Sequence, residues 1–375
     1  MFNKVMHMII LALLFITCAR GTDSLWDERN ISRNPGDSER PRIAVDKTGN
    51  VYVIWRDDEI EYDKSLVFFR ERKKGTWGEI KVLEDSTSYG VLTAEMVVDS
   101  RSNLHVVYEN DGAVYYLERE GGVWKDRVML SDSGETCSQP CLGIDSLDNL
   151  YVIWDYQVGS EWGMRLMKKV NDTWKGRFLP GFELTNPRMY VSPGGEIHIV
   201  AEGAGQVHYY HSSDGGENWD RIVRFPNNRP GGGEYYDWLP SVVEEGGYVY
   251  VFWTRSIVGR GIKGMYYSVK PPGGEFGDTT RVEMDMEEPN FSCVEGYNGY
   301  IYLVWRETDG SQTEVYLSKR RVPDGAWSEP LNVSRTETNS LSRSFCIRDG
   351  IVYIVWGEEI NGKDEEDIYF DEIAY

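Results

Sequence analysis

Charged side chains recur at regular intervals beside apolar, aromatic-rich segments of the chain. Arginines occur where such segments begin, at Arg42, Arg188 and Arg343. Carboxylates and further arginines follow where neighbouring segments end. Carboxylates close to one another or to arginine have shifted pKa values, as acid–base catalysis requires. The residues at the segment ends are Arg56, Asp57, Asp58, Glu109, Asp155, Glu202, Arg255, Arg306, Glu307, Glu358 and Glu359.

This pattern also has a simpler interpretation. A repeat protein places a similar polar residue at the end of each strand because that end is exposed to water. On the sequence alone, this solvated rim is favoured over a catalytic constellation.

A repeated unit positions these residues. Each unit has an apolar strand, a turn, a second strand that ends in an aromatic residue, a third aromatic-rich strand, and a Gly/Asp turn followed by Trp. From Trp55 to Trp356, equivalent second-strand ends are 301 residues apart over six intervals, so the period is close to 50. A four-stranded propeller blade needs roughly 40–50 residues, and hydropathy alternates with period two. The sequence predicts an all-β, seven-bladed β-propeller with four-stranded antiparallel blades.

The two ends of the chain are expected to share the last blade. Residues Ile368–Tyr375 resemble a third strand with no fourth strand after it, whereas Leu25–Ser32 resembles the fourth-strand segment Ala326–Ser334. The N-terminal strand should therefore close the ring, which removes free sheet edges. Six blades plus an irregular segment are the alternative. The expected blades are roughly 41–83, 93–130, 139–179, 186–225, 239–282, 289–333, and 341–375 joined with 25–32, with first strands often beginning at proline (Pro41, Pro140, Pro187, Pro240, Pro289).

The N-terminus has the pattern of a targeting segment. Lys4 precedes the apolar run Met8–Ile16, which is too short to span a bilayer. We expect a signal peptide at 1–21 and a single propeller domain at 22–375. A lipoprotein signal with Cys18 as the lipidated residue is the alternative. Both predict an extracytoplasmic location (secreted, periplasmic or cell-surface), and no other apolar run could span a membrane.

The net charge limits the kinds of partner that the protein can bind, and the cysteine content raises the question of disulfides. The 375-residue chain has a net charge of −21, which repels phosphate backbones and anionic lipid, so nucleic-acid binding is not expected. The same charge means that an acidic sugar would need a local arginine cluster. An exported protein can keep disulfides. Cys137 and Cys141 are close enough in sequence for a small-loop bridge, and Cys293 and Cys346 lie on the first strands of adjacent blades, where either a cross-blade bridge or two buried free thiols are expected.

The octapeptide Ser212–Trp219 reads S-x-D-x-G-x-x-W. It resembles the Asp-box (BNR repeat) of the sialidase superfamily, a hairpin that joins the two outer strands of a propeller blade. The resemblance implies an arginine triad for a substrate carboxylate (Arg42, Arg188, Arg343), an Asp general acid/base (Asp57 or Asp58), and a Tyr235 nucleophile activated by Glu234. Arg42 lies in Pro41-Arg-Ile-Ala44, which is similar to the Phe/Tyr-Arg-Ile-Pro motif of sialidases.

The sequence departs from this family in two respects. The sialidase fold is a six-bladed propeller, whereas seven blades are expected here. In addition, only one Asp-box in this sequence is intact. Seven-bladed ulvan-lyase-like propellers are similar in blade number, but they use His and Tyr as bases, and few histidines lie near this mouth.

Three functional hypotheses follow. The first is a module that binds a glycan or a surface protein at the central mouth; the second is an exo-acting glycoside hydrolase of sialidase type; the third is a non-catalytic surface scaffold. A hydrolase would require Arg42, Arg188 and Arg343 to converge on one spot. No cofactor or metal site is expected, because the histidines are scattered, and a monomer is expected. The expected ligand-binding residues are Arg42, Arg56, Arg188, Arg306, Arg343 and Trp238, with Trp162, Tyr235 and Tyr236 as further aromatics for stacking on a sugar.

Overall fold

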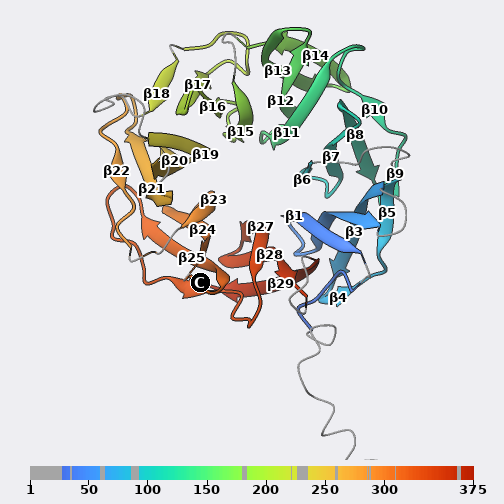
Figure 1. Cartoon of the computed structure of the whole chain (residues 1–375). Coiled ribbons are helices and arrows are strands. Elements are labelled where there is room, and N and C mark those ends of the chain that lie inside the picture. The colour runs from blue at the N-terminus through green and yellow to red at the C-terminus, as the bar shows by residue number, and fades with distance from the viewer. Residues whose placement is uncertain are drawn as a thin grey trace, which may run out of the picture.

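Seven antiparallel sheets stand around a common axis in the computed structural model of the chain (Figure 1). The structure describes residues 28–33, 36–59, 64–85, 93–179, 184–220, 222–225, 235–257, 261–284, 286, 289–308, 310–360 and 365–375. The expected signal peptide and Cys18 lie outside these ranges. Within them, no helix is long and apolar enough to cross a bilayer. The predicted all-β, seven-bladed propeller is confirmed.

The first four blades follow one another along the chain, each with its first strand nearest the axis. In the first two blades the outer strand is split into two short pieces. The strands are β1 (Asp37–Val45), β2 (Val51–Glu59), β3 (Lys64–Lys73), β4 (Thr76–Trp77) and β5 (Lys81–Asp85); β6 (Ala94–Val98), β7 (Leu104–Asn110), β8 (Ala113–Glu120), β9 (Val123–Trp124) and β10 (Val128–Met129); β11 (Thr136–Ile144), β12 (Leu150–Val158), β13 (Glu161–Val170) and β14 (Thr173–Phe178); β15 (Thr185–Val191), β16 (Ile197–Gly203), β17 (Gln206–Ser212) and β18 (Val223–Phe225).

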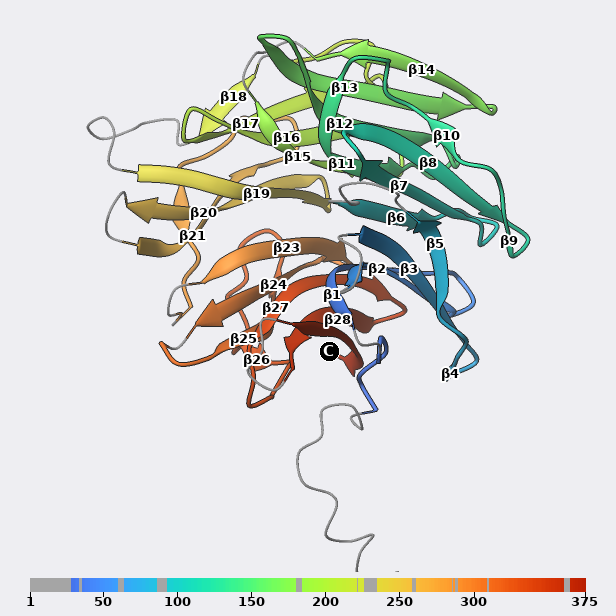
Figure 2. The same ribbon diagram turned by 45° about the vertical axis from the view of Figure 1, so that its right-hand side comes forward.

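The last three blades complete the circle, and the final sheet lies beside the first (Figure 2). The seventh blade has three named strands. The strands are β19 (Tyr235–Glu245), β20 (Tyr248–Ile257), β21 (Gly261–Lys270) and β22 (Thr280–Arg281); β23 (Asn290–Tyr297), β24 (Tyr300–Thr308), β25 (Thr313–Arg321) and β26 (Leu331–Asn332); β27 (Ser340–Arg348), β28 (Ile351–Glu359) and β29 (Glu366–Ala374).

The N-terminal segment closes the seventh blade, as predicted. Asn30 forms a β-bridge with Tyr369, and Ile31 N donates to Ile368 O at 2.7 Å. Ile31 is fully buried in a cluster that also contains Trp55 of the first blade and Phe370 of the last. The ring is therefore closed by backbone pairing and by apolar burial together.

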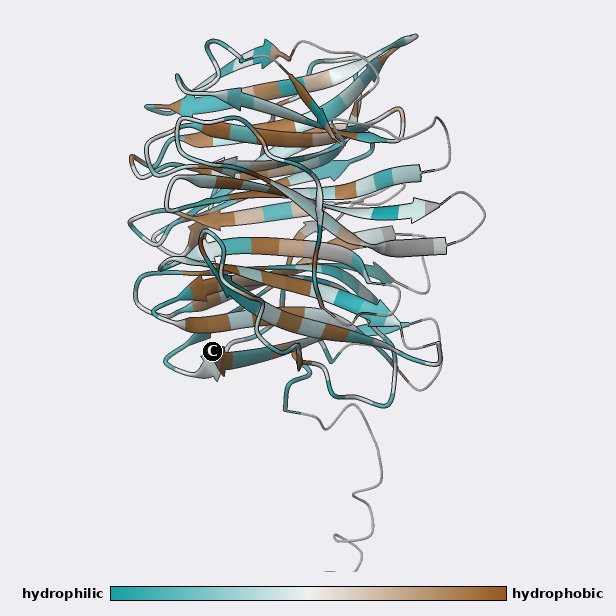
Figure 3. Cartoon of the chain, turned by 90° about the vertical axis from the view of Figure 1, so that its left-hand side faces the viewer, coloured by the Kyte–Doolittle hydropathy of each residue, from teal (hydrophilic) through white to brown (hydrophobic). Residues whose placement is uncertain are grey.

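The repeated aromatic residues pack between blades. Trp253 of β20, which is fully buried, lies in one cluster with Val207 and Phe225 of the preceding blade, and its ring stacks on Phe225 at 5.3 Å. Trp154 of β12 similarly shares a cluster with Tyr116 of β8. Apolar residues lie along the strands, and polar residues concentrate at the turns (Figure 3). Burial of these large rings between sheets stabilises the ring.

The innermost strands correct one expectation. Four of them begin before their prolines rather than at them: Pro41, Pro140 and Pro187 lie inside β1, β11 and β15, and Pro240 lies inside β19, whereas Pro289 directly precedes β23. Each of the four prolines inside a strand follows a residue in a β-bulge, where the register shifts against the second strand. A bulge takes residues out of the hydrogen-bonded ladder, so the missing proline N–H costs little there.

The octapeptide Ser212–Trp219 forms a compact turn after β17. Ser212 Oγ donates to Asp214 Oδ1 at 2.9 Å, and Asp214 accepts the backbone N–H of Asn218 at 2.8 Å. Gly215 and Gly216 have φ values of 69° and 92°, a region that favours glycine. Among the described cysteines, Cys137, Cys141, Cys293 and Cys346 are all free thiols.

Candidate functional site

A cavity of about 680 Å³ lies among the innermost strands of the ring. All seven blades contribute one first-strand residue to its lining, and these seven residues occupy equivalent positions. In each blade the residue pairs with the second-strand residue that comes just before the repeated aromatic residue (just before Ala201 in the fourth blade). The bulges place this position toward the axis in six of the blades. The seven residues are Arg42, Glu95, Cys141, Arg188, Ser241, Cys293 and Ser344.

The bulges also bring a second residue to the cavity. Arg40, Gln139, Asn186 and Leu239 each precede the bulge proline, and all four line the cavity. Their φ values are between 51° and 53°, in the left-handed region that non-glycine residues rarely adopt. Each such residue costs of the order of 1–3 kcal/mol. The same strained backbone geometry thus recurs in four blades, and in each of them it brings the residue before the proline to the cavity lining.

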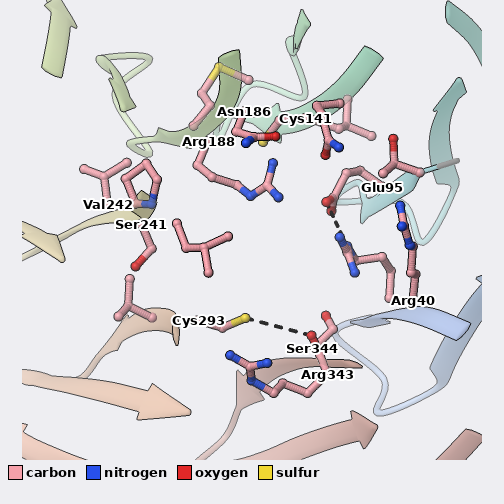
Figure 4. A pocket seen from close by; sticks show the side chains of 18 of the residues that line it. Arg40, Glu95, Cys141, Asn186, Arg188, Ser241, Val242, Cys293, Arg343 and Ser344 are labelled. Atoms are coloured by element: carbon pink, nitrogen blue, oxygen red, sulfur yellow. Dashed lines mark hydrogen bonds and ion pairs between the residues drawn. The ribbon is translucent and has the colours of Figure 1, made fainter. Parts of the chain in front are cut away.

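The predicted arginine triad converges on this cavity. Arg42, Arg188 and Arg343 come from the first, fourth and seventh blades, and all three line it. Arg188 and Arg343 enter from opposite sides (Figure 4). Arg306 at the end of β24 and Arg40 on β1 add two more guanidinium groups to the lining.

Local bonds orient two of these arginines. The Nη1 groups of Arg42 and Arg188 each donate to the carbonyl oxygen of the preceding proline at 2.9 Å. Arg42 Nε also donates to Glu95 Oε1 of the second blade at 2.8 Å. Within the described part of the chain, no carboxylate lies within 4.0 Å of the Arg188 guanidinium. Arg188 is therefore the guanidinium best placed to receive an external anion.

Arg343 occupies the most desolvated position of the group. It is 7 % exposed, and its Nη2 donates to Asn290 O at 3.0 Å. Burial, together with the positive charges of Arg306 and Arg42, lowers the pKa of Arg343 to about 10. Arg343 thus remains positively charged at neutral pH, in surroundings that disfavour its charge. An anion in the cavity would relieve this repulsion.

Four carboxyl groups lie among the arginines. Glu39, Glu95, Glu202 and Glu366 line the cavity. Burial raises the pKa of Glu202, against the opposing effects of a hydrogen bond from Leu239 N and the charge of Arg188. Burial also raises the pKa of Glu39, against the nearby charge of Arg56. A raised pKa favours the protonated form of a carboxyl group, which is the form that donates a proton.

The other predicted site residues lie outside the described lining. Asp57 is buried and accepts a hydrogen bond from Ser38 Oγ at 2.7 Å. Asp58 is bonded to Arg56 and Ser65 within the first blade. These bonds hold Arg56, Asp57 and Asp58 within their own sheet.

The predicted aromatic residues of the fifth blade are also separate from the lining. Tyr235 and Trp238 lie at the start of β19, and Arg255 lies 5.5 Å from the centre of the Tyr235 ring. Arg255 forms a two-pronged ion pair with buried Asp237, at 2.6 and 3.0 Å. Glu234 lies outside the described residues. The structure therefore brings together the predicted residues Arg42, Arg188, Arg306 and Arg343. Arg56, Asp57, Asp58, Tyr235 and Trp238 lie outside the described lining.

Comparisons with solved structures agree with this architecture over most of the chain. The polysaccharide lyase Uly1 superposes with a TM-score of 0.60 at 12 % identity, covering 95 % of this chain and 94 % of the lyase. A protein of unknown function from Dyadobacter fermentans gives 0.54 at 14 % identity, covering 92 % and 96 %. The Hadza microbial sialidase Hz136 gives 0.50 at 10 % identity, covering 90 % and 66 %. The fold is that of a sialidase-like β-propeller.

No protein-family model and no curated protein sequence match this sialidase-like propeller. Its cavity contains residues that the sequence analysis did not single out, chiefly Arg40, Glu39, Glu95 and Glu366. Glu95 could have been found by aligning the seven first strands, because it occupies the position of Arg42 and Arg188. Arg40 carried a weaker signal, its place immediately before a repeated proline.

Proposed function

We propose that this sialidase-like propeller binds an acidic saccharide, with the carboxylate of the ligand held by the arginines of the axial cavity. The observation that carries the proposal is the convergence of Arg188, Arg306 and Arg343, with Arg40 and Arg42, on one cavity of about 680 Å³. A cavity of this volume is in the range of small-molecule sites.

Electrostatics favour an anionic ligand over a neutral one. The chain as a whole has a net charge of −21, so five arginines in one cavity are not explained by general composition. Guanidinium groups donate paired hydrogen bonds that match a carboxylate. The fold is shared with the polysaccharide lyase Uly1 and with the sialidase Hz136, which supports a saccharide as the carrier of that carboxylate.

Binding is favoured over sialidase-type hydrolysis because Asp57, Asp58 and Tyr235 are absent from the described lining. The protein is further proposed to be exported, with 1–21 as its signal peptide and 22–375 as one domain. Cys18 would carry a lipid only if the lipoprotein interpretation holds.

Glu202 supports a second candidate function, a saccharide-cleaving enzyme. Its pKa is raised by burial, and it lies in the same cavity as Arg188, so it could donate a proton to a leaving oxygen. Turnover of a fluorogenic sialoside, or release of unsaturated uronic products from an acidic polysaccharide, would support this function. The Glu202→Gln variant should abolish either activity.

Calorimetric titration with 3′-sialyllactose, a glucuronic-acid oligosaccharide and neutral lactose tests the binding proposal. Arg188→Ala should weaken binding of the acidic ligand by about 10–100-fold, because a hydrogen bond to a charged group is worth roughly 1.5–3 kcal/mol. Arg101→Ala is the matched control, since Arg101 is 69 % exposed on a turn away from the lining. Equal affinity for lactose, or full affinity in Arg188→Ala, would refute the proposal.

A further inference from the structure

Two histidines of the fourth blade face the same point. His198 on β16 and His211 on β17 are register partners in the antiparallel pair, and their ring centroids are 4.9 Å apart. Glu196, just before β16, lies beside them. One ligand atom from each of Glu196, His198 and His211 lies within 4.8 Å of the other two. These residues are separate from the arginine-lined cavity.

In both histidine rings, Nδ1 has a hydrogen-bond partner on the side away from this point, so Nε2 is the nitrogen that faces it. Nδ1 of His198 is 2.8 Å from Tyr209 Oη, and Nδ1 of His211 is 2.6 Å from Asp220 Oδ2. A carboxylate on the far nitrogen is the arrangement that orients a metal-ligating histidine and raises its basicity. Both Nε2 atoms are thereby directed to the space between the rings and the neighbouring glutamates.

The distances in this space fit a metal ion better than they fit hydrogen bonds. His211 Nε2 is 3.4 Å from Glu196 Oε2, and His198 Nε2 is 3.5 Å from Glu244 Oε2. Hydrogen bonds between such atoms are normally shorter than about 3.2 Å. Metal–ligand distances of about 2.0–2.2 Å in tetrahedral geometry place neighbouring ligand atoms about 3.3–3.6 Å apart.

Burial adds a second, independent observation. His198 is 1 % exposed, and its Nε2 and the Oε2 of Glu244 are both buried without a hydrogen-bond partner. Buried polar atoms are normally satisfied, and the nearest partner of His198 Nε2 on this side, Glu244 Oε2, is too far away at 3.5 Å for a normal hydrogen bond. His198 Nε2 therefore remains available to a ligand.

We propose that Glu196, His198 and His211 form a binding site for a divalent transition-metal ion of the Zn²⁺ type. Imidazole and carboxylate ligands suit zinc. The sequence analysis expected no metal site, because the histidines were judged by their spacing alone. Glu244 on β19 of the fifth blade lies beside this site, with its Oε2 3.5 Å from His198 Nε2.

The second blade shows how the same position is filled without a metal. His105 has the same contact to a tyrosine, with Nδ1 2.7 Å from Tyr116 Oη. Its register partner is Glu118 rather than a histidine, and the ammonium of Lys169 lies 2.9 Å from Glu118 and 3.2 Å from Tyr116 Oη. A cation thus occupies the equivalent surroundings between the second and third blades.

Titration of ZnCl₂ into the EDTA-treated full chain, prepared without a histidine tag, tests the site. We expect one ion per chain. His211→Gln should abolish binding at this stoichiometry, and Asp220→Asn should weaken it by roughly 10–100-fold, as loss of a partner behind a ligand does. His105→Gln is the matched control and should bind zinc as the unaltered protein does.

Folding of the variants can be followed separately. His211 is partly exposed, so His211→Gln should unfold at the same temperature as the unaltered protein when both are free of metal. Added ZnCl₂ should raise the unfolding temperature of the unaltered protein alone. CoCl₂ should give the visible absorption of a four-coordinate ion, and this absorption should disappear in His211→Gln. Zinc binding unaffected by His211→Gln, or no one-to-one binding to the unaltered protein, would overturn the proposal.

Discussion

Arg42 and Glu95 face each other across the boundary between the first and second blades, with Arg42 Nε donating to Glu95 Oε1 at 2.8 Å. Both side chains line the cavity, and about one fifth of each is exposed (20 % and 19 %). The burial of Arg42 alone would lower its pKa, but the attraction of Glu95 raises the pKa above its ordinary value. An acidic ligand must therefore compete with Glu95 for one of the arginines.

Replacing Glu95 should release Arg42 for the ligand. We expect Glu95→Gln to bind 3′-sialyllactose about five-fold more tightly, which corresponds to roughly 1 kcal/mol, as measured by calorimetry. The double variant Glu95→Gln, Arg42→Ala should lose this gain. Weaker binding by Glu95→Gln would show that the carboxylate itself contacts the ligand.

The turn after β17 should tolerate no side chain at Gly216. A Cβ atom there would lie 2.7 Å from Leu166 Cδ2, at a φ of 92°. Gly134 has the same φ, but a Cβ atom there would meet nothing within 4 Å. Gly134→Ala should lower the free energy of unfolding by about 1 kcal/mol through backbone strain, and Gly216→Ala by about 2–4 kcal/mol, because overpacking adds to the strain. Urea unfolding measures both, and equal losses would contradict the role given to Leu166.

Asp46 should make the protein sensitive to acid. Burial alone would raise the pKa of Asp46, but hydrogen bonds from Thr48 and Asn50 lower it to about 2. A carboxylate with a lowered folded-state pKa stabilises the fold above the unfolded-state pKa of about 4, and this contribution is lost as the pH falls toward 2. Its size is at most about 2 kcal/mol.

The pH dependence can be isolated with Asp46→Asn. Urea unfolding should show this variant to be less stable than the unaltered protein at pH 6, with the difference shrinking as the pH approaches 2. Asp111→Asn, at an exposed turn position, should show no such convergence. A difference that does not change with pH would assign the effect of Asp46 to packing rather than to its charge.

Asp367 should control closure of the ring. It is fully buried and accepts hydrogen bonds from Asn30 Nδ2 at 2.6 Å and from Ser32 Oγ at 2.8 Å. Asp367→Ala would leave these two buried donors without their acceptor, which costs about 1–3 kcal/mol for each. The N-terminal segment should then become susceptible to limited proteolysis. Asp371→Ala on the same strand, whose carboxylate is 27 % exposed, should leave the segment protected.

Much of the fold was predictable because equivalent residues recur at a regular spacing, which aligns the blades with one another in the sequence. Trp55, Trp154 and Trp356 recur at one structural position, and a third strand at the C-terminus without a partner indicated where the N-terminal segment must lie. The starts of the first strands were not predictable from Pro41 or Pro187, because a proline inside a strand requires a bulge, and the bulge is created by pairing with the second strand.

The two sites differ in how much the sequence revealed. The sequence located Arg42, Arg188 and Arg343 at or near the starts of first strands, but their convergence on one cavity became evident only from the structure. The pairing of His198 with His211 was missed, although both lie six residues from the two-residue turn Ala204–Gly205 and therefore face each other. The position of Glu244 beside them depends on the packing of one blade against the next, which no local pattern encodes.

Because the N-terminal segment pairs with the last strand, the seventh blade cannot be completed early in synthesis. Asn30 and Ser32 are synthesised more than 300 residues before Asp367, their partner on β29. Contacts of such sequence separation form slowly, and they leave an early intermediate with an unpaired sheet edge. The ring can close only once β29 has been made, so a chain that lacks β29 would expose that edge to aggregation and degradation.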